Sequence, residues 1–281
     1  MDHPTGGRAL TTDAARLIPD GLDATLVLVR HGESTFIAEG RFQGQAETPL
    51  SPVGLRQAAL VADRLARPHD APALPVPNGD PLELVHSPLE RTTQTALAIE
   101  AAQRGAGRRV TRRPDAGFLE MHQGAWQGLH RTEIAERYGP QLAAWRRTPL
   151  EAWAPDGESL PEMQARVRPA LATILGRLAD GRPPGTHDRP QVAGYADPHP
   201  DHPWSIVVGH DGVFKVTLLT LFDLPLERFW MWSMDLCAVS VIEVRAGRPV
   251  LRAHNLTAHL AGLADARAVA ALDERASGGA L

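Results

Sequence analysis

The sequence has a single cysteine, Cys237, in a chain of 281 residues. One thiol excludes an internal disulfide framework and a cysteine-rich metal site. Cys237 is followed by the β-forming stretch AVSVIEV. We therefore interpret it as a buried structural thiol in a strand and not as a nucleophile.

Long apolar runs are also missing, because none approaches the length of a membrane span. Residues 1–22 contain three aspartates and no continuous apolar core, unlike a signal peptide. We therefore expect a cytoplasmic protein with no membrane contact. A net charge of only −4 gives no case for nucleic acid or an anionic membrane as a partner.

The chain contains 43% hydrophobic and 22% charged residues, a composition typical of a soluble globular protein. Its length permits one large α/β domain or two small ones. We predict a flexible leader over 1–22, one domain over 23–262 and a C-terminal tail over 263–281. Prolines crowd residues 181–203, which predicts an exposed insertion within that domain.

Three short apolar stretches each run directly into polar residues. LVLV precedes Arg30, LELV precedes His86, and SIVV precedes Gly209 and His210. Runs of this length and composition are typical of buried strands in a parallel sheet. Gly32 follows the first of them and allows a tight backbone path.

Helix start signals alternate with these strands. Ser51-Pro52 predicts a helix towards Arg67, and the segments 87–90 and 159–162 read as capping boxes that open two more. Further strands are predicted near 108–112, 235–244 and 249–255, and further helices near 130–138, 140–147 and 213–222. Strands that alternate with helices through right-handed crossovers predict a single three-layer α/β/α domain with a mostly parallel central sheet.

The carboxyl ends of neighbouring parallel strands meet at one crevice, where open α/β sheets bind ligands. There the sequence would bring together His31, His210, Arg30 and Arg91. Arginine matches phosphate oxygens in bidentate fashion and keeps its charge, and helix N-termini add backbone donors. The set predicts a receptor for a tetrahedral dianion.

A neutral imidazole can attack phosphorus, so His31 is the predicted nucleophile and a phosphohistidine the predicted intermediate. The arginines and His210 would neutralise charge on the oxygens that stay bound to phosphorus. We therefore expect no metal and no cofactor. Glu120, in the glycine- and aromatic-rich loop 117–128, is the predicted proton donor, with a pKa raised by burial.

These residues carry a resemblance to a known family. Arg30-His31-Gly32-Glu33-Ser34 resembles the RHG signature of the histidine phosphatase superfamily, the phosphoglycerate mutase-like family. The segments 40–58, 87–96, 119–128, 155–160 and 207–213 are similar to that family's successive blocks, in order, and EMHQGAWQG is similar to its broad-specificity phosphatase branch. The resemblance implies the phosphoglycerate mutase-like fold, His31 as the phosphorylated nucleophile and Glu120 as the proton donor. Arg30, Arg91 and His210 would complete the phosphate pocket.

Two positions depart from the family pattern, which often has Asn at Ile37 and Glu at Gln127. Ile37 would remove one polar contact to phosphate. Gln43, Gly44 and Asp211 are further candidate substrate contacts.

Three functions follow from these observations. The first is a phosphatase for phosphate monoesters of small molecules. The second is a metal-independent phosphoglycerate-type mutase, and the third is a non-catalytic phosphate-binding regulatory module. A homodimer through Phe229, Trp230 and Trp232 stays open, since these residues suit a core equally well. Asp197, His199, Asp201 and His202 offer metal-ligand side chains, but their proline-rich surroundings lead us to assign no metal there.

Overall fold

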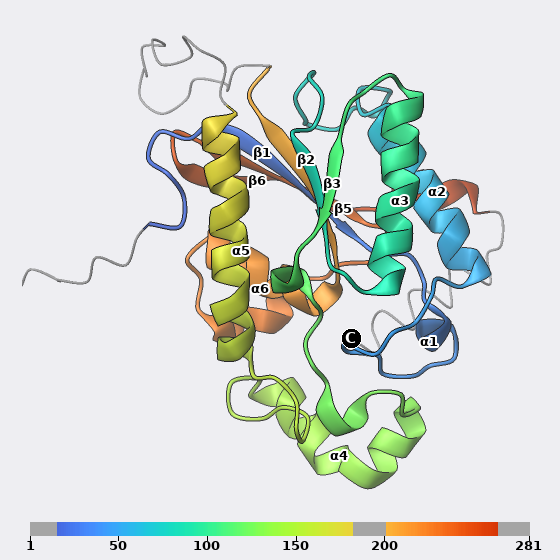
Figure 1. Cartoon of the computed structure of the whole chain (residues 1–281). Coiled ribbons are helices and arrows are strands. Elements are labelled where there is room, and N and C mark those ends of the chain that lie inside the picture. Colours follow the sequence, from blue (N-terminus) through green and yellow to red (C-terminus); the bar gives the residue numbers. More distant parts are fainter. Residues whose placement is uncertain (1–15, 182–200, 264–281) are drawn as a thin grey trace, which may run out of the picture.

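The computed structural model describes residues 16–181 and 201–263, which form an α/β fold: one β-sheet with helices on both of its faces (Figure 1). The strands are β1 Ala24–Arg30, β2 Glu83–His86, β3 Thr111–Pro114, β4 Trp204–Gly209, β5 Val239–Arg245 and β6 Arg248–Leu256. The α-helices are α1 Thr35–Ala38, α2 Pro52–Ala66, α3 Glu90–Gly105, α4 Arg131–Arg147, α5 Leu160–Asp180 and α6 Asp211–Leu221. Short 3₁₀ helices are η1 Ala116–Phe118, η2 Gly124–Trp126, η4 Leu226–Met231 and η5 Ala258–Gly262.

The strand order is β3-β2-β4-β1-β5-β6. The first four strands run parallel to one another, and β5 and β6 pair antiparallel at the other edge. Parallel strands with helical crossovers need both faces covered, which explains the unbroken apolar runs in the sequence. The predicted three-layer, mostly parallel fold is confirmed.

The two cores show how one apolar run serves both faces. Leu26 and Leu28 of β1 belong to the core formed with α5 and α6, whereas Val27 and Val29 belong to the core under α2 and α3. Successive side chains of a strand point to opposite faces, so every residue of the run is buried. Figure 1 shows these helix pairs on either side of the sheet.

Several helix starts follow their predicted caps. Ser51 caps α2 through its hydroxyl, which accepts the Gly54 N–H, and Ser159 caps α5 in a capping box with Glu162. The helices predicted near 130–138 and 140–147 form α4, in which two helical segments meet at a kink at Tyr138, two residues before Pro140, as the predicted division indicates.

The predicted capping box over 87–90 is wrong. Helix α3 begins at Glu90, its N-cap is Leu89, and no side chain caps it. The Ser87 hydroxyl is instead held by a residue of another strand end, as described below. Tertiary contact thus overrides the local signal.

The remaining differences are small shifts. Strand β3 begins at Thr111 and not near 108, in register with β2, and its arginines are compensated because Arg113 pairs with Glu83 and Arg112 with Glu100. Cys237 lies just before β5 and not inside it, with a positive φ of 55°.

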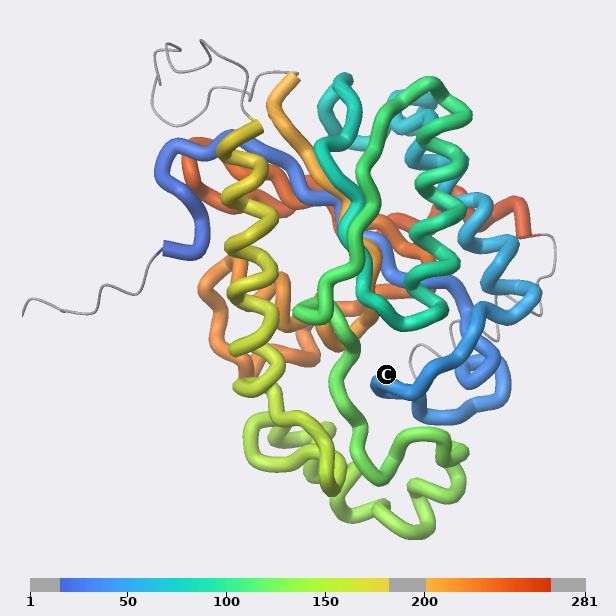
Figure 2. The backbone as a smooth tube through the Cα atoms, in the orientation of Figure 1, coloured from blue at the N-terminus to red at the C-terminus, as the bar shows by residue number. Residues whose placement is uncertain are grey.

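The structure describes only parts of the predicted leader, insertion and tail. Residues 1–15, 182–200 and 264–281 lie outside the described residues, and the predicted domain boundaries stay a prediction. Figure 2 shows the segment 35–50 and the segment 117–150 at the same end of the molecule, beyond the carboxyl ends of the parallel strands.

Candidate active site

Three strand ends place the predicted side chains. His31 directly follows β1, His210 directly follows β4, and Ser87 directly follows β2. Strand β4 pairs with both β1 and β2, so His210 emerges between the other two positions. The ring centres of His31 and His210 are 5.0 Å apart, which allows both rings to contact one bound oxyanion.

The His31 ring has a defined tautomer. Its Nδ1 lies 2.6 Å from the Gly32 carbonyl oxygen, which can only accept, so Nδ1 carries the proton. The lone pair is therefore on Nε2. Burial, followed by the charges of Arg91 and Arg30, lowers the pKa of His31 well below its ordinary value. A neutral imidazole with a free Nε2 suits nucleophilic attack.

Gly32 serves a close backbone approach. A Cβ at this position would lie 2.5 Å from the Gly54 carbonyl oxygen at the start of α2. Its φ is not in the left-handed region, so the glycine is required for space and not for a special turn. The contact sets the backbone that carries His31 against the first turn of α2.

His210 is held by Ser87. The His210 Nε2 lies 2.9 Å from Ser87 Oγ, and both side chains are buried. A serine that donates to Nε2 leaves the proton on Nδ1, which finds no hydrogen-bond partner among the described residues. Burial and the charge of Arg91 lower the pKa of His210 well below its ordinary value.

The two arginines are almost completely buried. One Arg91 amine donates to the Ala46 carbonyl at 2.9 Å and the other to the Gly44 carbonyl at 2.6 Å. Arg30 donates to the Met234 carbonyl. Burial lowers the pKa of Arg91 to about 10, so it keeps its charge at neutral pH.

Some donors of this cluster lack a protein acceptor. Within the described residues, the Nε atoms of Arg30 and Arg91 and the Nδ1 of His210 are buried without a hydrogen-bond partner. Buried polar groups are normally satisfied. Donors from three strand or helix ends beside a neutral histidine form a site suited to an oxyanion.

Glu120 is fully buried and lies against the first turn of α6. Its Oε1 accepts the Met121 N–H at 2.8 Å and the Val213 N–H at 3.0 Å, and its Oε2 accepts the Gly212 N–H at 3.2 Å. Burial and the charge of Asp211 raise the pKa of Glu120, although these N–H groups and Arg91 oppose the shift. The sequence predicted that helix N-termini at this crevice would donate to a ligand, but the first turn of α6 donates to the carboxyl group of Glu120.

The three further candidate contacts lie around the same strand ends. The Gly44 carbonyl accepts from Arg91, and the Gln43 side chain accepts the Ser34 hydroxyl. The Asp211 carboxylate pairs with Lys215 at 2.7 Å. Direct contact of these residues with a substrate stays a prediction.

Sequence reasoning missed the supporting role of two residues, of which it singles out Gln127 only as a departure from the family pattern. Arg166 of α5 donates to the carbonyls of Leu119 and Glu120, and the Gln127 side-chain oxygen accepts the Gln45 N–H. Both hold the loops that carry Glu120 and the acceptors of Arg91. No local pattern marks such residues, because their partners lie far away along the chain.

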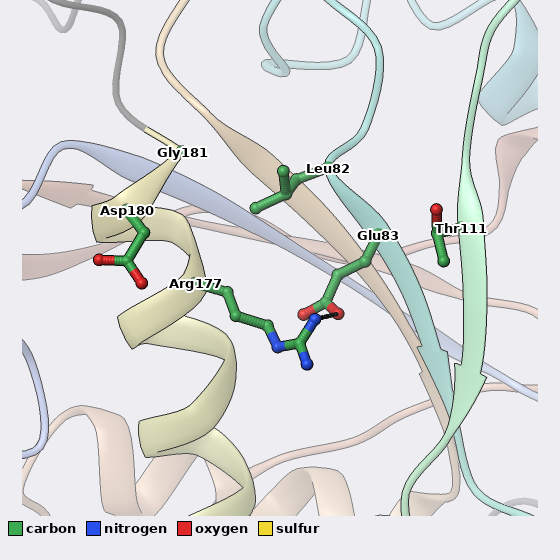
Figure 3. Close-up of a pocket in the computed structure, with 6 residues that line it drawn as sticks. All are labelled: Leu82, Glu83, Thr111, Arg177, Asp180 and Gly181. Atoms are coloured by element: carbon green, nitrogen blue, oxygen red, sulfur yellow. Dashed lines mark ion pairs between the residues drawn. The ribbon is translucent and has the colours of Figure 1, made fainter.

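A second hollow lies at the opposite end of the sheet (Figure 3). It is lined by the start of β2, Thr111 of β3 and the last turn of α5, where Arg177 lies 3.7 Å from Glu83. Since ligands of such sheets bind at the carboxyl ends of the strands, this hollow is not the candidate active site.

Metal-ligating side chains do not gather in the described part of the chain, where no group of three or more His, Cys, Asp or Glu residues could hold an ion. Asp197 and His199 lie outside the described residues, and His202 is buried against the Thr25 hydroxyl at 2.7 Å. Across residues 16–181 and 201–263, no helix is both long and apolar enough to span a membrane.

Comparison with known proteins decides the family. The family model "Histidine phosphatase superfamily (branch 1)" matches residues 26–182 and 189–257. The chain belongs to the histidine phosphatase superfamily. The family predicted from the sequence is confirmed.

Among its histidine phosphatase relatives, phosphoserine phosphatase 1 of Hydrogenobacter thermophilus is 29% identical over 236 residues, 84% of this chain and 93% of that protein. A protein of Yersinia pestis named as a probable phosphoglycerate mutase is 28% identical over 242 residues, 83% of this chain and 93% of that protein. A solved structure of a mycobacterial glucosyl-3-phosphoglycerate phosphatase with VO3 is 27% identical, covers 83% of this chain and 99% of its own, and has a TM-score of 0.65.

Proposed function

We propose that this protein hydrolyses phosphate monoesters of small organic molecules through a phosphohistidine on His31. The observation that carries the proposal is the pairing of a free His31 Nε2 with buried donors of Arg30, Arg91 and His210 that lack a protein acceptor. Such donors stabilise charge on the oxygens of a transferring phosphoryl group.

In the first step, His31 Nε2 attacks phosphorus, the N–P bond forms and the ester P–O bond breaks. Arg30, Arg91 and His210 donate to the three oxygens that stay on phosphorus. Glu120, whose pKa is raised by burial, gives its proton to the leaving oxygen, so the product departs as an alcohol.

In the second step, water attacks the phosphohistidine. The Glu120 carboxylate accepts one proton of that water, the N–P bond breaks, and inorganic phosphate leaves. His31 returns as the neutral imidazole that its low pKa favours. The site then holds the same protonation states as at the start.

The relatives support this reaction class, since phosphatases of phosphoserine and of glucosyl-3-phosphoglycerate are among them. We include Gln43, Gly44 and Asp211 in the proposal as substrate contacts. A cytoplasmic location and a metal-independent reaction also belong to it. Full activity after dialysis against EDTA is the expected result for the latter.

The mutase remains a second candidate, because this chain matches most of the length of a relative that is named a probable phosphoglycerate mutase. A mutase would pass the phosphoryl group from His31 to a rebound acceptor instead of to water. Incubation with a phosphoglycerate distinguishes the two: a hydrolase releases inorganic phosphate, and a mutase produces the isomer without release.

The direct test is trapping of the intermediate. Rapid denaturation during turnover of a ³²P-labelled phosphate ester should leave an acid-labile, base-stable label on the protein, and His31→Ala should abolish both label and turnover. The matched control is His130→Asn at the half-buried N-cap of α4. Turnover near the wild-type level in His31→Ala would exclude His31 as the nucleophile, and absence of turnover in the wild type would favour the non-catalytic module.

A further inference from the structure

Lys215 is the only lysine of the chain, whose other fixed cations are all arginines. It lies in α6, almost completely buried, and its Nζ pairs with Asp211 Oδ2 at 2.7 Å one helical turn earlier. The same Nζ lies 4.9 Å from the ring centre of Trp230 and 5.3 Å from that of Phe229. The ammonium is therefore enclosed between one carboxylate and two aromatic faces.

This environment suits a compact ammonium. Cation–π contact with Trp230 and Phe229 and the ion pair with Asp211 replace the water that Lys215 loses on burial. A buried ion pair is costly to break, since removal of one partner leaves the other charge uncompensated. Replacement of Lys215 by an uncharged residue therefore leaves the negative charge of Asp211 uncompensated.

Asp211 is next to the candidate proton donor. It is the first residue of α6, and the N–H groups of the following two residues, Gly212 and Val213, donate to the Glu120 carboxyl group. A Cβ on Gly212 would lie 2.6 Å from Glu120 Oε1, which shows how closely the carboxyl group packs on this turn. Glu120 thus contacts the backbone of the first turn of α6, and Lys215 contacts the side chain of Asp211 in the same turn.

We propose that Asp211 and Lys215 are positioning residues for the proton donor, with Lys215 compensating the charge of Asp211 beside Glu120 so that Glu120 can both donate and recover its proton. The inference rests on the proposed role of Glu120. Neither residue contacts the reacting phosphoryl group in this scheme.

Other charged groups face the same region and act on it together with the pair. The titratable and charged side chains around Glu120 and Asp211 from other elements are Arg91 of α3, Arg166 of α5, His254 of β6 and the pocket histidines His31 and His210. None of them bonds to the Asp211 carboxylate in a described contact, whereas Lys215 does.

Removal of the Lys215 charge and removal of the Asp211 charge should shift the ionisation of Glu120 in opposite directions along the pH scale. Without the Lys215 charge, the Asp211 anion opposes ionisation of Glu120, so the proton donor stays active to higher pH. Without the Asp211 charge, the Lys215 cation favours ionisation of Glu120, so activity falls at lower pH. Nearby charges in a buried site shift such titrations on the order of one pH unit.

The experiment measures kcat/KM for an alkyl phosphate against pH, where loss of the Glu120 proton gives a falling limb. Lys215→Met should move this limb to higher pH, Asp211→Asn should move it to lower pH, and the double variant should return it towards the wild type. Lys215→Arg, which keeps the charge, should leave the limb near the wild-type pH. Glu83→Gln breaks a buried ion pair at the other end of the sheet and should not move it.

The single lysine allows a second readout. Protein labelled with ¹³C,¹⁵N-lysine gives side-chain signals from Lys215 alone. These signals should shift across the pH range of the falling limb and should lose that transition in Glu120→Gln. This measurement needs no turnover, so it also applies to variants with low activity.

The outcomes separate this inference from the proposed function. If Glu120→Gln retains the falling limb, the proposed proton donor is wrong. If Glu120→Gln removes the limb but Lys215→Met and Asp211→Asn shift it in the same direction or not at all, the positioning pair is wrong and the proton donor stands. A rise in KM for Asp211→Asn with an unmoved limb would leave Asp211 only the substrate contact proposed above and would also overturn the inference.

Discussion

Replacement of Glu120 by glutamine tests the proposed proton transfer most directly, because glutamine keeps the shape of the side chain but cannot donate a carboxyl proton. General acid catalysis by a positioned side chain typically contributes about 10²–10⁴-fold. At about 1.36 kcal/mol for each factor of ten, this corresponds to roughly 3–5 kcal/mol of transition-state stabilisation. A leaving oxygen that is a weak base departs without a proton and therefore needs little of this stabilisation.

The assay compares kcat/KM over a series of phosphate esters that runs from 4-nitrophenyl to alkyl leaving groups. This parameter reports phosphoryl transfer to His31 and excludes the later attack of water. In Glu120→Gln we expect a loss of about tenfold or less for nitrophenyl phosphate and of about 10²–10⁴-fold for alkyl phosphates. A plot of log kcat/KM against leaving-group pKa should therefore become steeper.

The structure also gives the side effect of the substitution. Both Glu120 oxygens accept backbone N–H groups, and glutamine can accept only on one of its two positions, so the Gly212 N–H at 3.2 Å loses its partner. A lost buried hydrogen bond costs about 1–3 kcal/mol of stability, which a thermal melt detects. Glu162→Gln, a change of the same kind in the cap of α5, is the control. An equal loss across the whole ester series would refute the assignment of Glu120 as the acid.

Three further predictions follow from the pocket. Ser87→Ala removes the hydroxyl beside His210 Nε2 and should lower kcat/KM roughly tenfold, the size of one hydrogen bond of about 1–1.5 kcal/mol. The loss of this buried hydrogen bond should also lower the melting temperature. Full activity would show that Ser87 does not set the His210 tautomer. Ile37→Asn restores the polar residue that the family pattern often has at this position and should tighten inhibition by inorganic phosphate, so an unchanged inhibition constant would reject a phosphate contact there. The pKa values of His31 and His210 in the folded protein are below the ordinary 6.5, so the unfolded chain binds protons first as pH falls. The free energy of unfolding should therefore decrease below about pH 6.5, by up to about 1.4 kcal/mol per pH unit for each histidine. Urea titrations between pH 7.5 and 5 measure this slope, which should become smaller in His31→Gln; an identical slope would contradict the buried neutral state.

The layered fold and the positions of the parallel strands were predictable from the sequence. The apolar runs before Arg30, His86 and Gly209 are long enough to be strands and shorter than typical helices, and their polar ends must meet if the strands are neighbours. The hydroxyls of Ser51 and Ser159 also cap helices as predicted, because capping depends on residues three positions apart.

Local signals failed where a distant group competed for the same atoms. Ser87 has the sequence of a cap, but His210 lies 123 residues further along the chain and occupies its hydroxyl. The arginines of β3 were unfavourable for a strand until Glu83 and Glu100 supplied their counter-charges. In both cases the partner is set by the tertiary packing of strands and helices and not by neighbouring residues.

The sequence by itself determined which chemical groups the pocket contains, since residue types and strand ends do not depend on packing details. Only the tertiary structure decided their protonation and orientation. Glu120 accepts the N–H of Gly212, 92 residues further along the chain, and Lys215 pairs with Asp211 within α6. The charge around the proposed proton donor therefore depends on how α6 packs against the loop 117–128. Burial and long-range contact set a pKa, and neither is encoded in local sequence.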